Sequence, residues 1–189
     1  MLLSILTATL LSAAPLPAPA LPACIVMGMK VEGRASPLDS LSFKVGTSDV
    51  KVCYGRPSAK GRTMIGGEAV PFGKLWRTGA NEPTMIHTTG PIVIAGVAVP
   101  AGSYSLYTVP GPKTWSVIVN KSITQWGHEA RYTPEVKAQE VGTGTVNSEA
   151  TTTPVEMFTI SSQPGLRGST ELVLTWEKTK VVIPIAPGK

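Results

Sequence analysis

Between residues 84 and 119, short runs of β-branched, aliphatic and aromatic residues alternate with clusters rich in proline and glycine. The clusters are Ala95-Gly96, Pro100-Ala101-Gly102 and Pro110-Gly111-Pro112. Glycine adopts positive φ without steric cost and proline presets φ for a turn, so such clusters are typical of hairpin connections. This punctuation excludes long helices from the region and predicts strands at 84–88, 92–95, 97–99, 104–109 and 115–119.

The flanking segments extend this pattern. Apolar residues alternate with polar ones over 41–46 and 50–55, which indicates strands with one buried face, and Cys53 shares the outer face with Lys51. Closing strands are expected at 155–160, 171–176 and 180–185, and no long window shows an apolar period of 3.6 residues. We therefore predict an all-β domain, an antiparallel β-sandwich or a jelly-roll-like barrel of about nine or ten short strands. Its long loops are expected at 55–82 and 121–153.

The amino terminus has the pattern of an export signal. The first 23 residues carry no charged side chain, and their apolar run is too short for a membrane-spanning helix but typical of a secretory signal. Ala18-Pro19-Ala20 is a small-x-small cleavage site, whereas Leu21-Pro22-Ala23-Cys24 resembles a lipobox in which Cys24 would be lipidated. We expect a signal peptide over 1–23, a linker over 24–40 and one β-sandwich domain over 41–185. The protein is expected in the bacterial envelope, either periplasmic or anchored as a lipoprotein.

The two cysteines leave three arrangements open. Cys24 is acylated and Cys53 stands alone, or the two form a disulfide, or Cys53 is simply an unpaired residue on its strand. The last is the simplest interpretation. Neither the cysteines nor the isolated His87 and His128 have the spacing of a metal site, so we expect no metal and no cofactor.

The formal net charge of +5 lies entirely in one segment. Between Lys51 and Arg77 there are six basic residues and the single acid Glu68, and the rest of the chain is balanced. These basic residues are not surrounded by a set of aromatic residues for stacking bases, and the chain is expected to be exported, so we expect no nucleic-acid partner. An anionic envelope component, or a ligand that carries carboxylate or phosphate, fits better. The alternative is a solvated basic loop.

Several long runs resemble a known family. Residues 54–62 read YGRPSAKGR, residues 70–82 read VPFGKLWRTGANE, and residues 100–107 read PAGSYSLY; WSVIVNK at 115–121 and QWG at 125–127 follow. These runs are similar to the signatures of the bacterial family known as domain of unknown function 2911 (DUF2911), and the resemblance covers residues 36–185. It implies an exported protein, often a lipoprotein, and implies no reaction. This chain departs from the signature at Gly55, where the family usually has serine.

The first two signature runs supply a candidate ligand site. Arginines in these runs would grip an anion or a polyol, and Glu82 beside Arg77 would be ionised and orient the guanidinium. Alternatively, the same groups form an ion-pair network that pins the loop to the sandwich. Trp76 and Trp126 lie in loops, where each would either stack on a sugar ring or anchor its loop, whereas Trp115 and Trp176 are expected in the core. The candidate residues are Arg56, Lys60, Arg62, Trp76, Arg77, Asn81 and Glu82.

These observations favour a binding protein over an enzyme. We predict an exported, non-catalytic β-sandwich protein that binds an anionic or polyol/glycan ligand through its basic Gly-rich loop. One alternative is a hydrolase that uses Glu82, with Glu68 as the second carboxylate. The other is a purely structural envelope protein. Membrane attachment is expected only through a lipid on Cys24.

Overall fold

The computed structural model describes residues 20–189, and the expected signal peptide lies outside the described residues as far as position 19. The chain is almost entirely β, and all the strands predicted between residues 41 and 119 are present. The strands are β1 Leu38–Val45, β2 Ser48–Gly55, β3 Thr84–Thr88, β4 Ile92–Ile94, β5 Val97–Val99, β6 Gly102–Val109, β7 Thr114–Asn120, β8 Glu140–Pro164 and β9 Thr170–Pro187.

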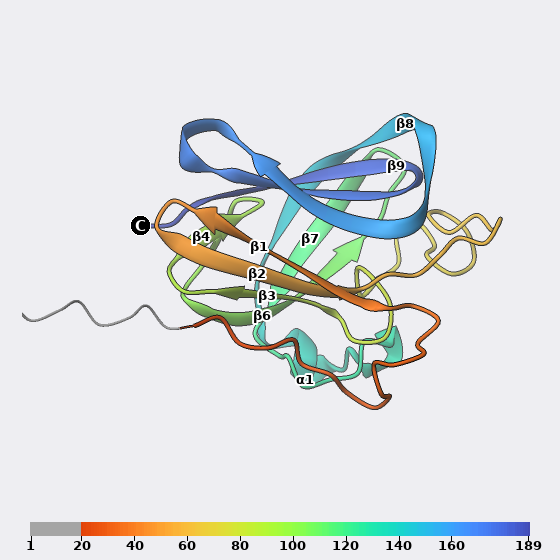
Figure 1. Cartoon of the computed structure of the whole chain (residues 1–189), viewed down its shortest axis with the longest axis horizontal. Helices are drawn as coiled ribbons and strands as arrows, with labels where there is room; N and C mark the ends of the chain where they lie inside the picture. Colours follow the sequence, from red (N-terminus) through yellow and green to blue (C-terminus); the bar gives the residue numbers. More distant parts are fainter. Residues whose placement is uncertain (1–19) are drawn as a thin grey trace, which may run out of the picture.

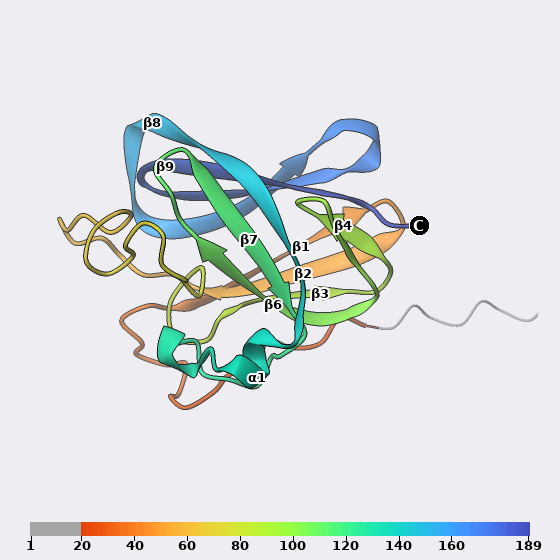
Figure 2. The ribbon, with the colours of Figure 1, turned by 180° about the vertical axis from the view of Figure 1, so that it is seen from behind.

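The nine strands form one antiparallel sheet in the order β1-β2-β3-β6-β7-β8-β9-β4-β5, and this sheet does not close into a barrel. The first part of β8 pairs with β7, while the rest of β8 pairs with β9. Because β8 bends between these two partners, the sheet folds over on itself. Figures 1 and 2 show the resulting layers, with β8 and β9 facing β1, β2, β3 and β6.

The main core lies between the two facing layers. Val50 and Val52 on β2 and Leu172 and Leu174 on β9 are all at most 2% exposed and belong to the same apolar cluster. The intervening residues of β2 point to the opposite face, as the period-two pattern predicts. Burying one face of each layer is what drives the layers together.

An aromatic cluster fills one end of this core. The Trp76 ring, from the long connection between β2 and β3, lies 6.0 Å from Trp115 of β7, 5.1 Å from Phe158 of β8 and 5.9 Å from Trp176 of β9. All four side chains are at most 4% exposed. The predicted core positions of Trp115 and Trp176 are therefore confirmed, and Trp76 anchors its loop instead of offering a surface for stacking.

The predicted loop at 121–153 is wrong in its second half, because β8 begins at Glu140. The inward positions of this strand include Gly142 and Gly144, so its alternation carries little apolar signal. A Cβ at Gly144 would lie 2.1 Å from the Ala95 carbonyl oxygen, and one at Gly142 would lie 3.0 Å from Val97. The turn between β4 and β5 packs directly on these glycines, and this close approach explains why the strand has no apolar period.

A second buried layer lies on the outer face of β2, β3 and β6. Residues 20–37, which we call the N-terminal segment, run across this face together with the excursion that contains η1 (Glu129–Arg131) and α1 (Pro134–Lys137) (Figure 1). Met85 and Cys53 are at most 3% exposed beneath this cover. The expected linker at 24–40 is thus packed against the domain. Within residues 20–189, no helix is long and apolar enough to cross a membrane.

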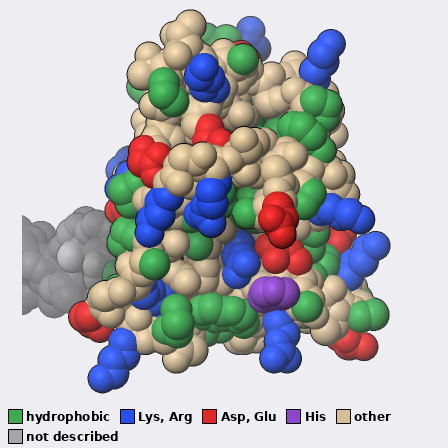
Figure 3. All heavy atoms as spheres, turned by 90° about the vertical axis from the view of Figure 1, so that its right-hand side faces the viewer, with side chains coloured by type: hydrophobic (Ala, Val, Ile, Leu, Met, Phe, Trp, Pro, Cys, Tyr) green, Lys and Arg blue, Asp and Glu red, His purple; other side chains and the backbone are tan. Residues whose placement is uncertain are grey.

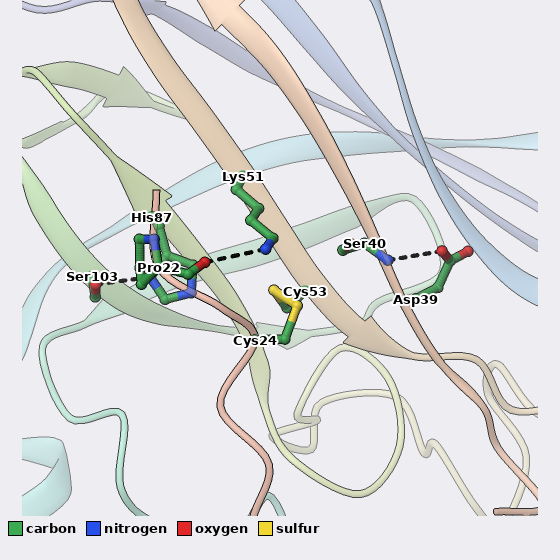
Figure 4. Close-up of a disulfide and its surroundings, with 8 residues drawn as sticks. All are labelled: Pro22, Cys24, Asp39, Ser40, Lys51, Cys53, His87 and Ser103. Carbon is green, nitrogen blue, oxygen red and sulfur yellow. Dashed lines mark hydrogen bonds between the residues drawn. A yellow bond between two sulfur atoms is a disulfide. The ribbon is translucent and has the colours of Figure 1, made fainter. Parts of the chain in front are cut away.

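The N-terminal segment is held covalently, because Cys24 forms a disulfide with Cys53 of β2 (Figure 4). The Lys51 ammonium on the same face donates a hydrogen bond to the Pro22 carbonyl at 3.1 Å. The expected unpaired Cys53 is contradicted by this bond. Lipidation of Cys24 would need the same sulfur for a diacylglyceryl thioether, so it stays a prediction that is mutually exclusive with the disulfide. Cys53 does lie on the outer face as predicted, but the segment that it binds buries it.

Removing the disulfide tests how much this cover contributes to stability. The Cys24→Ser/Cys53→Ser variant should lose about 3 kcal/mol of unfolding free energy, because the unfolded chain regains the entropy of the opened loop. Urea denaturation of the variant and of the oxidised and reduced wild type measures the loss. Thiol titration of the native protein is the control, and two free thiols would contradict the assignment.

Candidate functional site

The candidate residues divide into two groups on different parts of the long connection between β2 and β3, which we call the 56–83 loop. Arg77, Asn81 and Glu82 face the N-terminal segment and the excursion after β7. Lys60 and Arg62 lie over the hairpin of β8 and β9, and Arg56 bridges β1 and β8. The structure therefore does not bring the predicted arginines together into a single cluster.

Glu82 is paired with Arg34, a residue absent from the predicted site. Arg34 Nη1 lies 2.7 Å from Oε2, Nη2 lies 2.9 Å from Oε1, and the Met27 N–H donates to Oε1 at 2.7 Å. The two side chains are only 2% and 5% exposed. Burial alone would raise the pKa of Glu82, but the hydrogen bonds from Arg34 and Met27 and the guanidinium charge together lower it. Glu82 is thus an ionised anchor for the N-terminal segment.

Arg77 and Asn81 also make contacts that hold the loop in place. Arg77 Nε lies 3.3 Å from the Glu129 carboxylate, and its Nη1 donates to the Asn81 carbonyl at 3.3 Å. The Asn81 amide donates to the Ser36 carbonyl at 3.0 Å. The expected ion pair between Arg77 and Glu82 is therefore replaced by two separate pairs. Arg34 and Glu129 lie well away from Glu82 and Arg77 in sequence, and no local pattern marks them as partners.

Arg56 fastens the start of the loop to the sandwich. Its guanidinium lies 3.2 Å from Asp39 of β1, and it donates to Thr159 Oγ1 at 3.0 Å and to the Phe158 carbonyl at 3.3 Å. These partners come from β1 and β8, so Arg56 joins the two facing layers of the folded sheet. Its donors point at the protein, which leaves Arg56 poorly placed to receive a ligand.

Gly55, the departure from the family signature, ends β2 and lies against residues 79–80 near the end of the loop. A Cβ at Gly55 would lie 2.1 Å from the Ala80 carbonyl oxygen. Glycine is needed here because the backbone of residues 79–80 approaches this closely. A serine at position 55 would require that backbone to move away.

The remaining candidates border a groove between the 56–83 loop and the β8–β9 hairpin. Arg62 lines it, while Lys60 next to it is exposed and its backbone N–H donates to Glu156 Oε1 at 2.7 Å. The groove has a volume of about 510 Å³, which lies within the range of about 300–1,000 Å³ usual for small-molecule sites. Figure 3 shows the end of the molecule from which this loop projects, with basic and acidic side chains interspersed over its surface.

The groove contains a mixed set of hydrogen-bonding groups. Arg62 and Lys178 supply donors, Glu156 and Glu177 supply carboxylates, and Thr63 and Thr179 supply hydroxyls. Glu177 Oε2 accepts from the Met64 and Ile65 N–H groups at 3.0 and 2.9 Å, so this carboxylate also fixes the loop. This set can donate to and accept from the same neutral polar molecule.

Sequence reasoning missed the half of the groove contributed by β8 and β9. Glu177 lies 113 residues from Met64, and only the pairing of β8 with β9 brings its region under the loop. Lys60 and Glu177 at this groove both have positive φ, 51° and 50°, as do four non-glycine residues elsewhere among the described residues. Non-glycine residues in this region are uncommon and cluster at functional sites. Glycine would have signalled a positive φ in the sequence, but lysine and glutamate at these positions give no such signal.

His87 is a further buried side chain that can titrate. It is 1% exposed on the outer face of β3, and its Nδ1 lies 2.7 Å from Ser103 Oγ (Figure 4). Burial first, and then the positive charge of Lys51, lower the pKa of His87. The ring is therefore neutral at pH 7. Among residues 20–189, no three His, Cys, Asp or Glu side chains cluster as metal ligands would.

The fold and the groove define a two-layered all-β protein with a hydrogen-bonded loop beside a polar groove. The family model described as "Protein of unknown function (DUF2911)" matches residues 36–185, and the chain belongs to this family. The expected family is confirmed. Searches of curated proteins and of solved structures return no match.

Breaking the buried pair tests the structural role of Glu82. Glu82→Gln should destabilise the protein by about 3 kcal/mol, because the Arg34 charge loses its partner in a buried position. Lys44→Ala, which breaks the exposed pair of Lys44 and Asp49, should cost less than about 1 kcal/mol. Urea denaturation at neutral pH compares the two. The stabilisation from Glu82 is present above the ordinary carboxyl pKa and is lost as pH falls through the lowered folded pKa. Equal losses in the two variants would refute this role.

The neutral His87 predicts a second pH dependence. Since the folded pKa is lowered, the unfolded chain binds the proton first, and stability should fall as pH drops below the ordinary histidine value of 6.5. His87→Gln should flatten the pH profile of unfolding free energy between neutral pH and the acid range. His128→Gln, which removes an exposed histidine, is the matched control and should keep the wild-type slope. A slope unchanged in His87→Gln would contradict the prediction.

Proposed function

We propose that this protein is an exported, non-catalytic binding protein that takes a polyol or glycan in the groove between the 56–83 loop and the β8–β9 hairpin. The observation that supports this most is the groove itself, with about 510 Å³ lined by donors and acceptors of both kinds. Its rim is already organised by hydrogen bonds, as is usual for small-molecule sites.

The charge balance favours a polyol over a simple anion. The groove is lined by two cations, Arg62 and Lys178, and by two carboxylates, Glu156 and Glu177, so it has no excess positive charge. A neutral ligand rich in hydroxyl groups can accept from the cations and donate to the carboxylates at the same time. A small anion gains little net attraction in this groove, because the two carboxylates offset the two cations.

The disulfide supports the proposed export. Disulfides form and persist in oxidising environments such as the bacterial periplasm and are rare in the cytosol. The Cys24–Cys53 bond fits a mature chain in which Cys24 is retained with its sulfur unmodified. A periplasmic location therefore fits better than a lipid anchor at this residue.

The two alternative functions receive different support. A hydrolase that uses Glu82 needs a carboxyl group that can exchange protons with a substrate. Both oxygens of Glu82 accept hydrogen bonds from buried partners, and its pKa is lowered, so it is poorly suited to act as an acid. A structural role fits Arg56, Arg77 and Glu82 individually but gives no reason for the groove.

Titration with sugars tests the proposal. Glucose, N-acetylglucosamine and galacturonic acid, each as the monosaccharide and as its linear 1,4-linked tetrasaccharide, are titrated into the oxidised protein by calorimetry. At least one should bind, with an affinity that changes little between low and high salt. Lys178→Ala should weaken that binding about ten-fold, whereas Lys121→Ala, which removes an exposed lysine outside the groove, should not.

The outcomes separate the functions. Binding that survives in Lys178→Ala would overturn the assignment of the groove. A lack of binding by all six sugars would overturn the proposed function. A strong loss of affinity with salt, seen only for galacturonic acid and its tetrasaccharide, would favour the anionic ligand instead.

A further inference from the structure

A second hollow adjoins the groove. Ile65, Lys178 and Thr179 line the groove and also line a second, smaller depression of about 120 Å³. The far side of this depression is formed by Phe72 of the 56–83 loop and by the turn between β6 and β7 at Gly111 and Pro112. The two hollows are thus neighbours that share one boundary.

Phe72 is an exposed aromatic ring held in a fixed position. Its side chain is 45% exposed, although the other aromatic residues of the 56–83 loop and the adjoining strands are buried. The ring lies directly on Gly66, where an added Cβ would be 2.5 Å from it. The next residue, Gly73, donates its N–H to the Pro110 carbonyl at 2.8 Å. An exposed ring costs solvation free energy, and here packing and a backbone hydrogen bond keep it in place.

The distance between the two hollows is fixed by the same loop. The Glu177 carboxylate accepts hydrogen bonds from the Met64 and Ile65 N–H groups, and the Gly66 N–H donates to the Val70 carbonyl at 2.9 Å. These contacts close residues 64–70 into a compact turn with Ile65 at its base, and Phe72, which follows the turn, packs on Gly66. A ligand would therefore meet a prearranged set of hydrogen-bonding groups in one hollow and an aromatic face in the other.

We propose that the ligand is a linear oligosaccharide that spans both hollows. This inference rests on the proposed function and extends it. One sugar unit occupies the larger groove, where its hydroxyl groups meet Arg62, Lys178 and the two carboxylates. A following unit crosses Ile65 and stacks the apolar face of its ring on Phe72. Sugar rings expose such a face of C–H groups, and Phe72, half-exposed and lining the smaller hollow, is a suitable apolar surface for it.

Truncating Phe72 tests this arrangement. The sugar that binds best in the panel above is titrated as monosaccharide and as tetrasaccharide into the wild type, Phe72→Ala and Leu166→Ala. Leu166 is 85% exposed and does not line either hollow, so its truncation is the matched control. The tetrasaccharide should bind the wild type more tightly than the monosaccharide does. Phe72→Ala should weaken tetrasaccharide binding about five-fold and leave monosaccharide binding unchanged. Circular dichroism melts of the three proteins verify that the fold is retained.

The result distinguishes this inference from the function on which it rests. Equal affinities for the monosaccharide and the tetrasaccharide, both unaffected by Phe72→Ala, would overturn the two-hollow site while the proposed function stands. If Phe72→Ala weakens both ligands equally, Phe72 belongs to the first hollow and the extended site is wrong. If Phe72→Ala unfolds, the amide chemical shifts of the wild type are measured with each ligand instead. The extended site then requires shift changes at residues 66 and 72–73 that the tetrasaccharide causes and the monosaccharide does not.

Discussion

The packing of Trp76 among the aromatic side chains of the core determines how the rest of the candidate site is arranged. Trp76 belongs to a long connection without regular strands, yet its ring contacts Trp115, Phe158 and Trp176 from three different strands. Its backbone also forms a bridge with Thr108 of β6, with hydrogen bonds of 2.8 and 2.9 Å. Because the middle of the loop is part of the core, its two halves are held on either side of a fixed point.

The two halves then take different roles. The half before Trp76 lies over the β8–β9 hairpin, where Glu177 and Glu156 accept hydrogen bonds from its backbone. A groove remains between this half of the loop and the hairpin. The half after Trp76 binds the N-terminal segment through the pair of Glu82 with Arg34. The disulfide of Cys24 with Cys53 holds the same segment. The same arginine-rich sequence therefore contributes the proposed ligand groove in one part and structural ion pairs in another.

Much of the fold could be predicted because its signals are local. The Pro-Gly clusters placed the hairpins between 84 and 119, and the alternation at 50–54 placed Val50 and Val52 in the core and Cys53 on the outer face. β8 was missed where it needs glycine at inward positions to admit the β4–β5 turn. Of the candidate site, the sequence identified the loop, and Arg62 lies in the groove. The partners from β8 and β9 could not be predicted, because Glu177 lies more than 100 residues from the loop that it contacts and such a contact leaves no local sequence pattern.

The sequence by itself determined the β class, the family, the position of the important loop and the concentration of charge within it, since these depend on residue type and on spacing along the chain. The tertiary structure decided which charges are paired. It joined Glu82 to Arg34, Arg77 to Glu129 and Cys24 to Cys53, and it placed the groove against Glu177. The physical reason is that a charge or a thiol has many candidate partners of equal chemistry in a sequence. Only the packing of the layers, which buries some groups together and leaves others in solvent, selects among them.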